Sequence, residues 1–342
     1  MGTPEFAVPS LDALVRNGYD VVLVVTQKDK PRDRGKETKM PAVKEYALSA
    51  GLPVLQPERL SRQPEMVEAI HSARPDLLVT CAFGQLLPQS VLDIPPLGTI
   101  NVHGSLLPAL RGAAPIQWAI LNGDAQTGIT TMFTDIGLDT GDMLLKEIVE
   151  IPEDMTAGEL HDMMSIVGAA TLIKTLHELE AGTLRRHQQQ DEAATHAPRI
   201  SKAMGQIDWT RSAWEIHNQV RGLEPWPGAW TSLGGKAMRV ISTKSPGRPG
   251  SEASAASVAG TVAPGTTAPV ATAPGTVLSD AVPPDAVLPG TVLAANAEGL
   301  LVQTGDRPLL IREIQMPSSR RMRVGEWLNG HAVQPGIVLG NA

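Results

Sequence analysis

The stretch 76–102, DLLVTCAFGQLLPQSVLDIPPLGTINV, decides the fold class of this chain. The apolar run Asp76–Cys81 predicts a buried strand, Gln85–Leu92 predicts a helix, and Gly98–Val102 predicts a second strand. A strand, a helix and a second strand in this order form a βαβ unit, whose two strands lie parallel. We therefore expect an α/β domain built on a parallel sheet with helices on both faces.

The same alternation continues on both sides of this unit and places the first domain at residues 1–182. The β-branched run Val21–Thr26 is typical of a strand that is buried on both faces. The further expected elements are helices at Pro9–Arg16, Pro41–Ala50, Met66–Ala73, Ala113–Leu121 and Thr156–Glu180, and strands at Ile129–Thr134 and Met143–Ile151.

The rest of the chain has a different pattern. Residues 183–207 are polar and are expected to form a linker. From 208 to 342, short strand-like pieces predict a small OB-like β-barrel domain. Inside it, residues 245–290 contain 8 prolines and 6 glycines, which indicates a low-complexity insertion. The strand-like pieces are Ala237–Ile241, Gly290–Ala294, Leu300–Thr304 and Leu309–Glu313.

Composition excludes several classes of protein. A formal charge of -7 argues against non-specific coating of nucleic acid, although a local basic patch could still bind phosphates. The single cysteine, Cys81, excludes an intrachain disulfide and a cysteine metal cluster, and we expect it to be a buried small side chain. Phosphate-binding and dinucleotide-binding glycine motifs are missing, as are stretches apolar and long enough to span a membrane. We expect a cytoplasmic protein.

Three polar residues could form a catalytic site. Asn101 and His103 lie two positions apart at the end of a predicted strand, so their side chains point the same way. Asp139 lies in a glycine-containing loop that can bend closely around a ligand. An amide donor, an imidazole and a carboxylate suit acyl transfer to an amine, which needs oxyanion stabilisation and proton movement. On spacing alone, a strand-end histidine is more often a structural hydrogen-bonding residue, so the residues by themselves leave both readings open.

Ordered motifs along the chain nevertheless match one family. They resemble the methionyl-tRNA formyltransferase family over nearly the whole chain apart from 245–290. The motifs are GTPEFA from Gly2, FGQLLP from Phe83, NVHGSLLP from Asn101, RGAAPIQ from Arg111, GLDTGDM from Gly137, IDW from Ile207, RGL from Arg221, PWPGA from Pro225, and PG at Pro335.

The resemblance implies a Rossmann-like first domain and formyl transfer from 10-formyltetrahydrofolate to initiator methionyl-tRNA, without a metal. Asn101, His103 and Asp139 match the family's catalytic residues. Asn101 and a protonated His103 would stabilise the oxyanion, and Asp139 would hold His103 and help to move the amine proton. The residues that would bind folate are Ser105, Leu106, Leu107 and Pro108 in one loop, and Phe83, Gly84, Asp135, Ile136 and Gly137 around the pterin.

Two basic clusters are candidates for binding tRNA. Between Lys28 and Lys44, seven basic and three acidic residues give a net charge of +4. This stretch resembles the family's loop that enters the acceptor stem, which implies tRNA contacts for Arg34, Lys36 and Lys39. Any one of these lysines could equally be an ordinary solvated charge. We expect a monomer that binds RNA phosphates at two points. The second cluster is Arg307, Arg312, Arg320, Arg321 and Arg323, of which Arg320 and Arg321 are the tRNA-binding candidates.

The chain departs from the family at its start. Relatives have a hydrophobic strand before the GTPEF motif, whereas Met1 directly precedes the motif here. The first strand is thus expected to be missing, and Met1 to be an internal methionine of a longer native chain. Two alternatives to the implied function stay open. One is a folate-dependent formyltransferase acting on a glycinamide ribonucleotide or an amino sugar; the other is a catalytically impaired RNA-binding relative.

Overall fold

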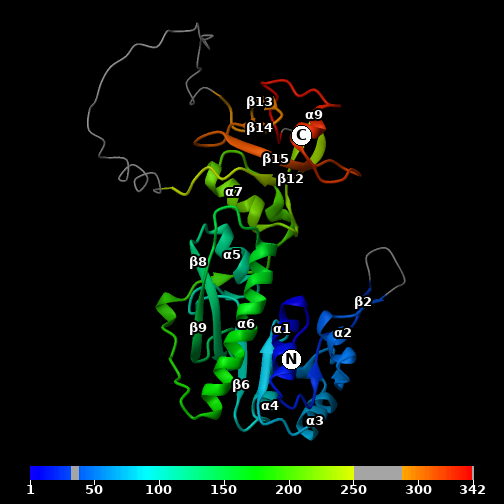
Figure 1. Cartoon of the computed structure of the whole chain (residues 1–342), viewed down its shortest axis with the longest axis vertical. Coiled ribbons are helices and arrows are strands. Elements are labelled where there is room, and N and C mark those ends of the chain that lie inside the picture. Colours follow the sequence, from blue (N-terminus) through cyan, green and yellow to red (C-terminus); the bar gives the residue numbers. More distant parts are fainter. Residues whose placement is uncertain (32–37, 250–286, 341–342) are drawn as a thin grey trace, which may run out of the picture. The chain divides into compact units, whose positions relative to one another are not determined.

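A computed structural model describes residues 1–31, 38–249 and 287–340 of the chain (Figure 1). It divides into two compact units. The first contains Met1–Ile120 and Asp124–Ile200, and the second contains Leu121–Gly123 and Ser201–Ala342. Residues 183–200, expected as part of a linker, thus belong to the first unit. Within the described residues, no helix has the length and apolar character that crossing a membrane requires.

The central sheet of the first unit is mixed. Its strand order is β5-β6-β8-β9, with β5 parallel to β6 and the other neighbours antiparallel. The expected parallel pairing therefore holds for β5 and β6, but it does not extend to β8 and β9. The loop 134–142 between those two strands is too short for the crossover that parallel strands need. The bounds are Leu78–Cys81 for β5, Thr99–His103 for β6, Gln126–Phe133 for β8 and Met143–Glu150 for β9.

Helix α6 (Ala157–Glu180) packs on β6, β8 and β9, and α1 lies beside it (Figure 1). A capping box fixes its start: Thr156 accepts a hydrogen bond from the Glu159 amide, and the Glu159 carboxylate accepts one from Thr156. Helix α6 therefore covers one face of the sheet. The other helices are α1 (Val8–Arg16), α2 (Ala42–Ser49), α3 (Pro64–Ser72), α4 (Gln89–Leu92) and α5 (Pro115–Leu121), and the short strands are β1 (Val24–Val25), β2 (Lys30–Pro31), β3 (Thr38–Lys39), β4 (Val54–Leu55), β7 (Arg111–Gly112) and β10 (His196–Ala197).

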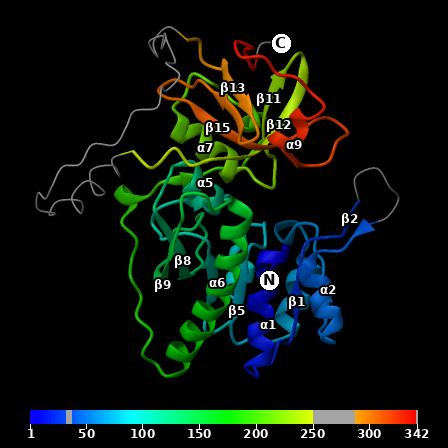
Figure 2. The same ribbon diagram turned by 45° about the horizontal axis from the view of Figure 1, so that its top comes forward.

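Met1 and Gly2 join β5 to β1, which itself pairs in parallel with β4. The Met1 α-amino group donates to the Val79 carbonyl at 2.6 Å, and the Cys81 amide donates to the Met1 carbonyl at 2.9 Å. On the other side, the Gly2 amide donates to the Val25 carbonyl at 3.0 Å. The start of the chain thus lies between β5 and β1 (Figure 2). Met1 and Gly2 therefore bond to β5 on one side and to β1 on the other.

The surroundings of Met1 are largely apolar. Side chains from residues 21–25, β5 and α1 line an adjacent pocket of about 580 Å³. Burial lowers the pKa of the Met1 amino group to about 6 and raises the pKa of the Cys81 thiol to about 12. A thiol with so high a pKa is a poor nucleophile, so Cys81 serves as a small buried side chain.

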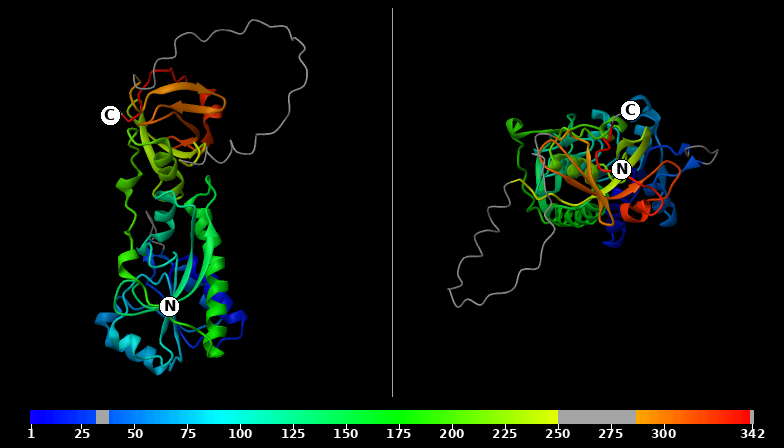
Figure 3. Two further views of the ribbon diagram at one scale, coloured as in Figure 1. Left: turned by 90° about the vertical axis from the view of Figure 1, so that its left-hand side faces the viewer. Right: turned by 90° about the horizontal axis from the view of Figure 1, so that it is seen from above.

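The second unit contains an antiparallel sheet with the strand order β11-β12-β15-β14-β13 and with β16 on β15. Its strands are coloured yellow-green to red in Figure 3. In the described part of the chain β11 and β13 do not pair with each other, so a closed barrel is not seen. The bounds are Ala229–Leu233 for β11, Lys236–Thr243 for β12, Val292–Asn296 for β13, Gly299–Val302 for β14, Leu309–Gln315 for β15 and Met322–Arg323 for β16; the helices are α7 (Ala213–Gly222) and α9 (Val324–Leu328). Most of the expected insertion, 250–286, lies outside the described residues.

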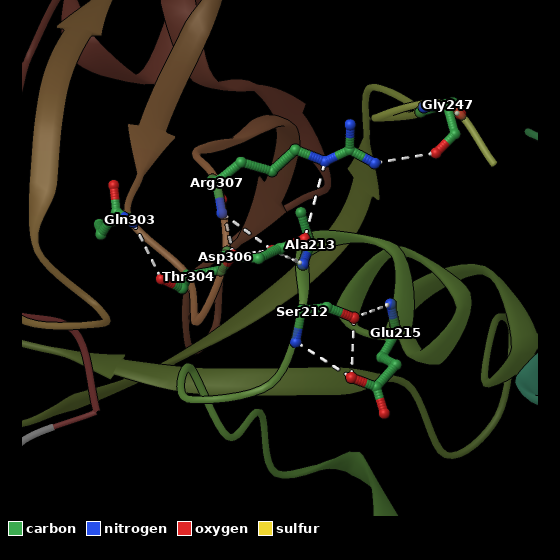
Figure 4. A network of polar contacts seen from close by, with 9 residues as sticks. Ser212, Ala213, Glu215, Gly247, Gln303, Thr304, Asp306 and Arg307 are labelled. Atoms are coloured by element: carbon green, nitrogen blue, oxygen red, sulfur yellow. Dashed lines mark hydrogen bonds and ion pairs between the residues drawn. The ribbon is translucent and has the colours of Figure 1, made fainter. Parts of the chain in front are cut away.

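A polar network fixes the start of α7 onto the sheet (Figure 4). Ser212 and Glu215 form a capping box, and the Ala213 amide donates to Asp306 Oδ1 at 2.7 Å. Thr304 Oγ1 donates to the same oxygen at 3.0 Å. The Ala213 amide is thereby satisfied by a loop nearly a hundred residues away, whereas the Glu215 amide is satisfied locally by Ser212.

The buried amino group makes stability depend on pH in the chain that begins at Met1. Its pKa is about 6 in the folded state and 8.0 when unfolded, so between these values the unfolded chain binds more protons. The free energy of unfolding should therefore rise with pH, by about 2–3 kcal/mol across this window. Urea unfolding below pH 6 and above pH 8 measures it. The acetylated chain is the control, and an identical pH dependence in both proteins would contradict the prediction.

Candidate active site

Strand β6 positions Asn101. In the parallel register of β5 and β6, Thr80 lies opposite Asn101, and its hydroxyl donates to Asn101 Oδ1 at 2.8 Å. An amide oxygen that accepts this bond fixes the orientation of the side chain, because the NH₂ group must then point the other way. Among the described residues Asn101 Nδ2 has no hydrogen-bond partner. Asn101 therefore presents two free donors.

His103 lies two positions further along the same strand, and its side chain is only 6% exposed. Its Nε2 is 3.1 Å from the Leu110 carbonyl oxygen. A carbonyl oxygen can only accept, so Nε2 must carry the proton. Nδ1 then faces Asp139 Oδ2 at 3.6 Å, which is too long for a direct hydrogen bond. The nitrogen left for chemistry is Nδ1.

Asp139 is held in place by the loop 134–142. Its backbone φ is +55°, in the left-handed region. Its carboxylate accepts a hydrogen bond from the Gly112 amide at 2.9 Å. At the start of the loop, Asp135 Oδ1 accepts from the Gly137 amide and the Thr140 hydroxyl, at 3.0 and 2.6 Å. A side chain at Gly141 would lie 1.9 Å from the Phe133 carbonyl, so the close turn requires glycine there.

A pocket of about 700 Å³ brings these groups together. Asn101, His103 and Asp139 all line it. So do the residues expected around the pterin, together with several that the sequence did not single out, such as His161. The expected lining residues are Phe83, Gly84, Asp135, Ile136 and Gly137.

The Ser105–Pro108 loop is placed differently, because its residues are not among those that line the pocket. Ser105 is fully buried, and its hydroxyl donates to the Ala109 carbonyl at 2.6 Å. The Leu107 amide donates to Thr130 Oγ1 at 3.1 Å, and the Lys146 ammonium donates to the Leu107 carbonyl. Partial burial lowers the pKa of Lys146. Thr130 on β8 and Lys146 on β9 thus bind the backbone of this loop.

The basic residues that are candidates for binding tRNA differ in whether a nearby carboxylate compensates their charge. Arg34 and Lys36 lie outside the described residues. Lys39 forms an exposed ion pair with Glu5 at 3.5 Å. Arg321 pairs with Glu313 and lies 3.9 Å from Glu224. Arg320 is exposed and has no ion pair in the part of the chain that the structure describes.

Sequence reasoning missed two residues that shape the site. Thr80 orients Asn101, but it appears in the sequence as one more residue of a buried strand. Gln189 is 8% exposed and donates to backbone carbonyls of the Asp139 loop, yet it stands in the run His187–Gln190 that predicts a solvated linker. The signals for both roles are contacts between distant segments, which spacing along the chain does not reveal.

Comparisons with known proteins match this chain to formyltransferases over nearly its whole length. The family model described as Formyl transferase matches residues 1–176, and the one for the formyl transferase C-terminal domain matches residues 199–332. The methionyl-tRNA formyltransferase of Acetivibrio thermocellus is 49% identical over 99% of this chain and 98% of its own length. That of Ruminiclostridium cellulolyticum is 47% identical over the same shares.

Solved structures show the same fold at low identity. An N-formyltransferase from Helicobacter canadensis, in complex with folinic acid and dTDP-3-aminofucose, superposes with a TM-score of 0.59 at 17% identity. It covers 94% of this chain and 97% of its own. HypX from Aquifex aeolicus, in complex with tetrahydrofolic acid, gives a TM-score of 0.52 at 18% identity and covers 85% of this chain and 47% of its own.

Replacing Thr80 tests the orientation of Asn101. In Thr80→Val, Asn101 Oδ1 loses its donor, so the free energy of unfolding should fall by about 1 kcal/mol. Thr99→Val is the matched control: Thr99 is also buried, but its hydroxyl has no partner among the described residues, so its loss should be neutral. Urea unfolding of both variants measures the difference. Equal losses would show that the Thr80 hydroxyl contributes nothing specific.

Proposed function

The chain belongs to the methionyl-tRNA formyltransferase family, and from this membership we propose that it transfers the formyl group of 10-formyltetrahydrofolate to initiator methionyl-tRNA. The reaction would serve translation initiation in the cytoplasm. The observation that carries the proposal is the meeting of Asn101, His103 and Asp139 at one pocket, because an amide donor, an imidazole and a carboxylate are the groups that formyl transfer to an amine needs.

The pocket suits a folate. Its volume of about 700 Å³ is within the range of about 300–1,000 Å³ that is usual for drug-sized ligands. Phe83 and Ile136 offer apolar surface to a pterin ring, and the backbone of 135–137 offers polar groups at its edge. The Ser105–Pro108 loop would contact the folate only if the bound ligand extended past the pocket wall.

Asn101 and His103 would stabilise the transition state. The neutral methionine amine attacks the formyl carbon, so a C–N bond forms and the formyl oxygen becomes negatively charged. Asn101 Nδ2 donates to this oxygen, since its own Oδ1 is occupied by Thr80. A protonated His103 Nδ1 is the second donor, because Nε2 is committed to the Leu110 carbonyl.

Asp139 would transfer the proton of the attacking amine to the folate nitrogen. The attacking amine carries an excess proton once the new bond has formed, and the Asp139 carboxylate lies beside the site to accept it. The C–N bond to the folate nitrogen then breaks, and the same proton passes to that nitrogen, directly or through one water. At 3.6 Å, Asp139 and His103 Nδ1 lie too far apart for a direct hydrogen bond, and an amine or a water beside them could contact both groups.

The second unit would bind the tRNA, with Arg320 as its best available cation. Register irregularities between β12 and β15 and between β13 and β14 increase strand twist, which favours the small OB-like barrel expected from the sequence. The basic residues Arg34, Lys36 and Lys39 of the first unit would supply the other contact with RNA phosphates.

Alanine at Asn101 or His103 tests the catalytic assignment. Removing an oxyanion donor should lower kcat by about 10²–10³-fold while tRNA binding persists. Formylation should be assayed with charged initiator tRNA, glycinamide ribonucleotide and an amino sugar in parallel. His71→Ala, an exposed histidine on α3, is the control. Unchanged formylation in both site variants, or preference for another acceptor, would overturn the proposal.

Arg320 and Arg321 allow a matched test of tRNA binding. Arg320 has no ion pair among the described residues, whereas Arg321 lies beside two carboxylates. Arg320→Ala should weaken binding of initiator tRNA and reduce the slope of log affinity against log salt by about 1, as for one lost phosphate contact. Arg321→Ala should have the smaller effect, because Glu313 and Glu224 already compensate that guanidinium. Filter binding over a salt series measures both. Equal effects would exclude Arg320 as a dedicated phosphate contact.

A further inference from the structure

Gln189 binds the backbone of the Asp139 loop at two points. Its Nε2 donates to the Asp139 carbonyl and to the Gly141 carbonyl, each at 2.8 Å. One primary amide thus uses both of its N–H groups on carbonyls two residues apart in the same loop. Because Gln189 is nearly buried, water cannot readily replace these bonds if the side chain is lost.

The other end of the amide is fixed as well. Arg111 Nε donates to Gln189 Oε1 at 3.0 Å, and Arg111 Nη2 pairs with Asp191 at 2.8 Å. A flipped amide would point its oxygen at two carbonyls and its NH₂ at a guanidinium, so only one orientation is compatible with these neighbours.

These contacts continue through Arg111 to the Asp139 carboxylate. Arg111 is followed by Gly112, whose amide donates to Asp139 Oδ2. Strand β7, which contains both residues, pairs with β10 at His196–Ala197, and the Arg111 amide donates to the Thr195 carbonyl at 2.9 Å. The backbone of Asp139 is therefore held by Gln189 and its side chain by Gly112, and Arg111 connects the two.

We propose that Gln189 is a positioning residue for formyl transfer: through Arg111 and the loop carbonyls, it sets the place of the Asp139 carboxylate relative to His103 Nδ1. This inference rests on the proposed function. Asp139 has a left-handed backbone, which is less favourable for aspartate than for glycine, although aspartate adopts it more readily than most residues. Without the Gln189 bonds the loop can relax, and the carboxylate would leave its position 3.6 Å from the imidazole.

Gln189→Leu is the main test, because leucine keeps similar bulk and removes all three hydrogen bonds. A displacement of about 1 Å at a catalytic group can cost about 10²-fold in rate, so kcat should fall by about 10–100-fold with little change in KM. Gln188→Leu and Gln190→Leu are matched controls from the same run, because both side chains are exposed, and they should behave like the unaltered protein.

A double-mutant cycle with Asp139→Asn distinguishes positioning from general damage. If Gln189 acts through the Asp139 carboxylate, Gln189→Leu should cost little further activity once that carboxylate is gone. Equal costs in both backgrounds would overturn the proposal, as would a Gln189→Leu variant that matches its two controls.

Hydrogen exchange gives a readout that does not need activity. The Gly112 amide, protected by Asp139 Oδ2, should exchange at least about tenfold faster in Gln189→Leu than in the controls. If the unaltered protein formylates none of the acceptors, the proposed function fails, and the exchange result still decides whether Gln189 holds the loop. If Gln189→Leu does not fold, Arg111→Met replaces it, because it removes the bond that fixes the Gln189 amide, and the Gly112 amide should again exchange faster than in the controls. Unchanged exchange of the Gly112 amide would overturn the proposed role of Gln189 and Arg111 in holding the Asp139 loop.

Discussion

The backbone ladder between β5 and β6 is the constraint on which the rest of the site depends. Its register sets Thr80 opposite Asn101, so strand pairing itself supplies the hydroxyl that orients the Asn101 amide. The two-residue period of the same strand then puts His103 on the face that Asn101 occupies. A slip of one residue would reverse both side chains and turn Thr80 away from Asn101. The burial of β6 under α6 makes such a slip costly.

Sequence patterns predict what is local and fail where distant segments meet. The two strands of the unit at 76–102 and the long helix α6 follow from apolar spacing, and all three are present. The helix between the two strands is shorter than expected, because α4 spans Gln89–Leu92 and not Gln85–Leu92. The short loop 134–142 makes β9 antiparallel to β8, whereas the connection from β6 to β8 is long enough for either direction. The apolar pattern of a strand is the same in both directions, so it does not show which one β8 takes. Asn101, His103 and Asp139 are visible as polar residues at strand ends and in a glycine loop. Gln189 is not, because its burial arises from folding 183–200 back onto the first unit.

The net charge of a sequence stretch likewise does not show which of its cations are paired in the structure. The +4 of the stretch 28–44 is a sum over residues, but Lys44 is largely buried against Asp29 at 2.8 Å, and Lys28 lies 3.2 Å from Glu58. Such pairs contribute little to stability when they are exposed. They nevertheless determine which cations can meet a phosphate without first losing a partner. Counting charges along the chain therefore overstates the basic surface, and the difference between Arg320 and Arg321 is visible only in three dimensions.

The site is held mainly by hydrogen bonds to backbone groups. His103 is fixed by a carbonyl, Asp139 by an amide and by Gln189, and the Ser105–Pro108 loop by Thr130 and Lys146. Backbone groups do not titrate, and buried contacts with them are screened little by salt. A site built in this way can keep its geometry while, in the proposed reaction, the Asp139 carboxylate takes up the amine proton and releases it again. The formyl transfer proposed for this site requires that property, because the attack of the amine and the departure of the folate would use one arrangement of donors.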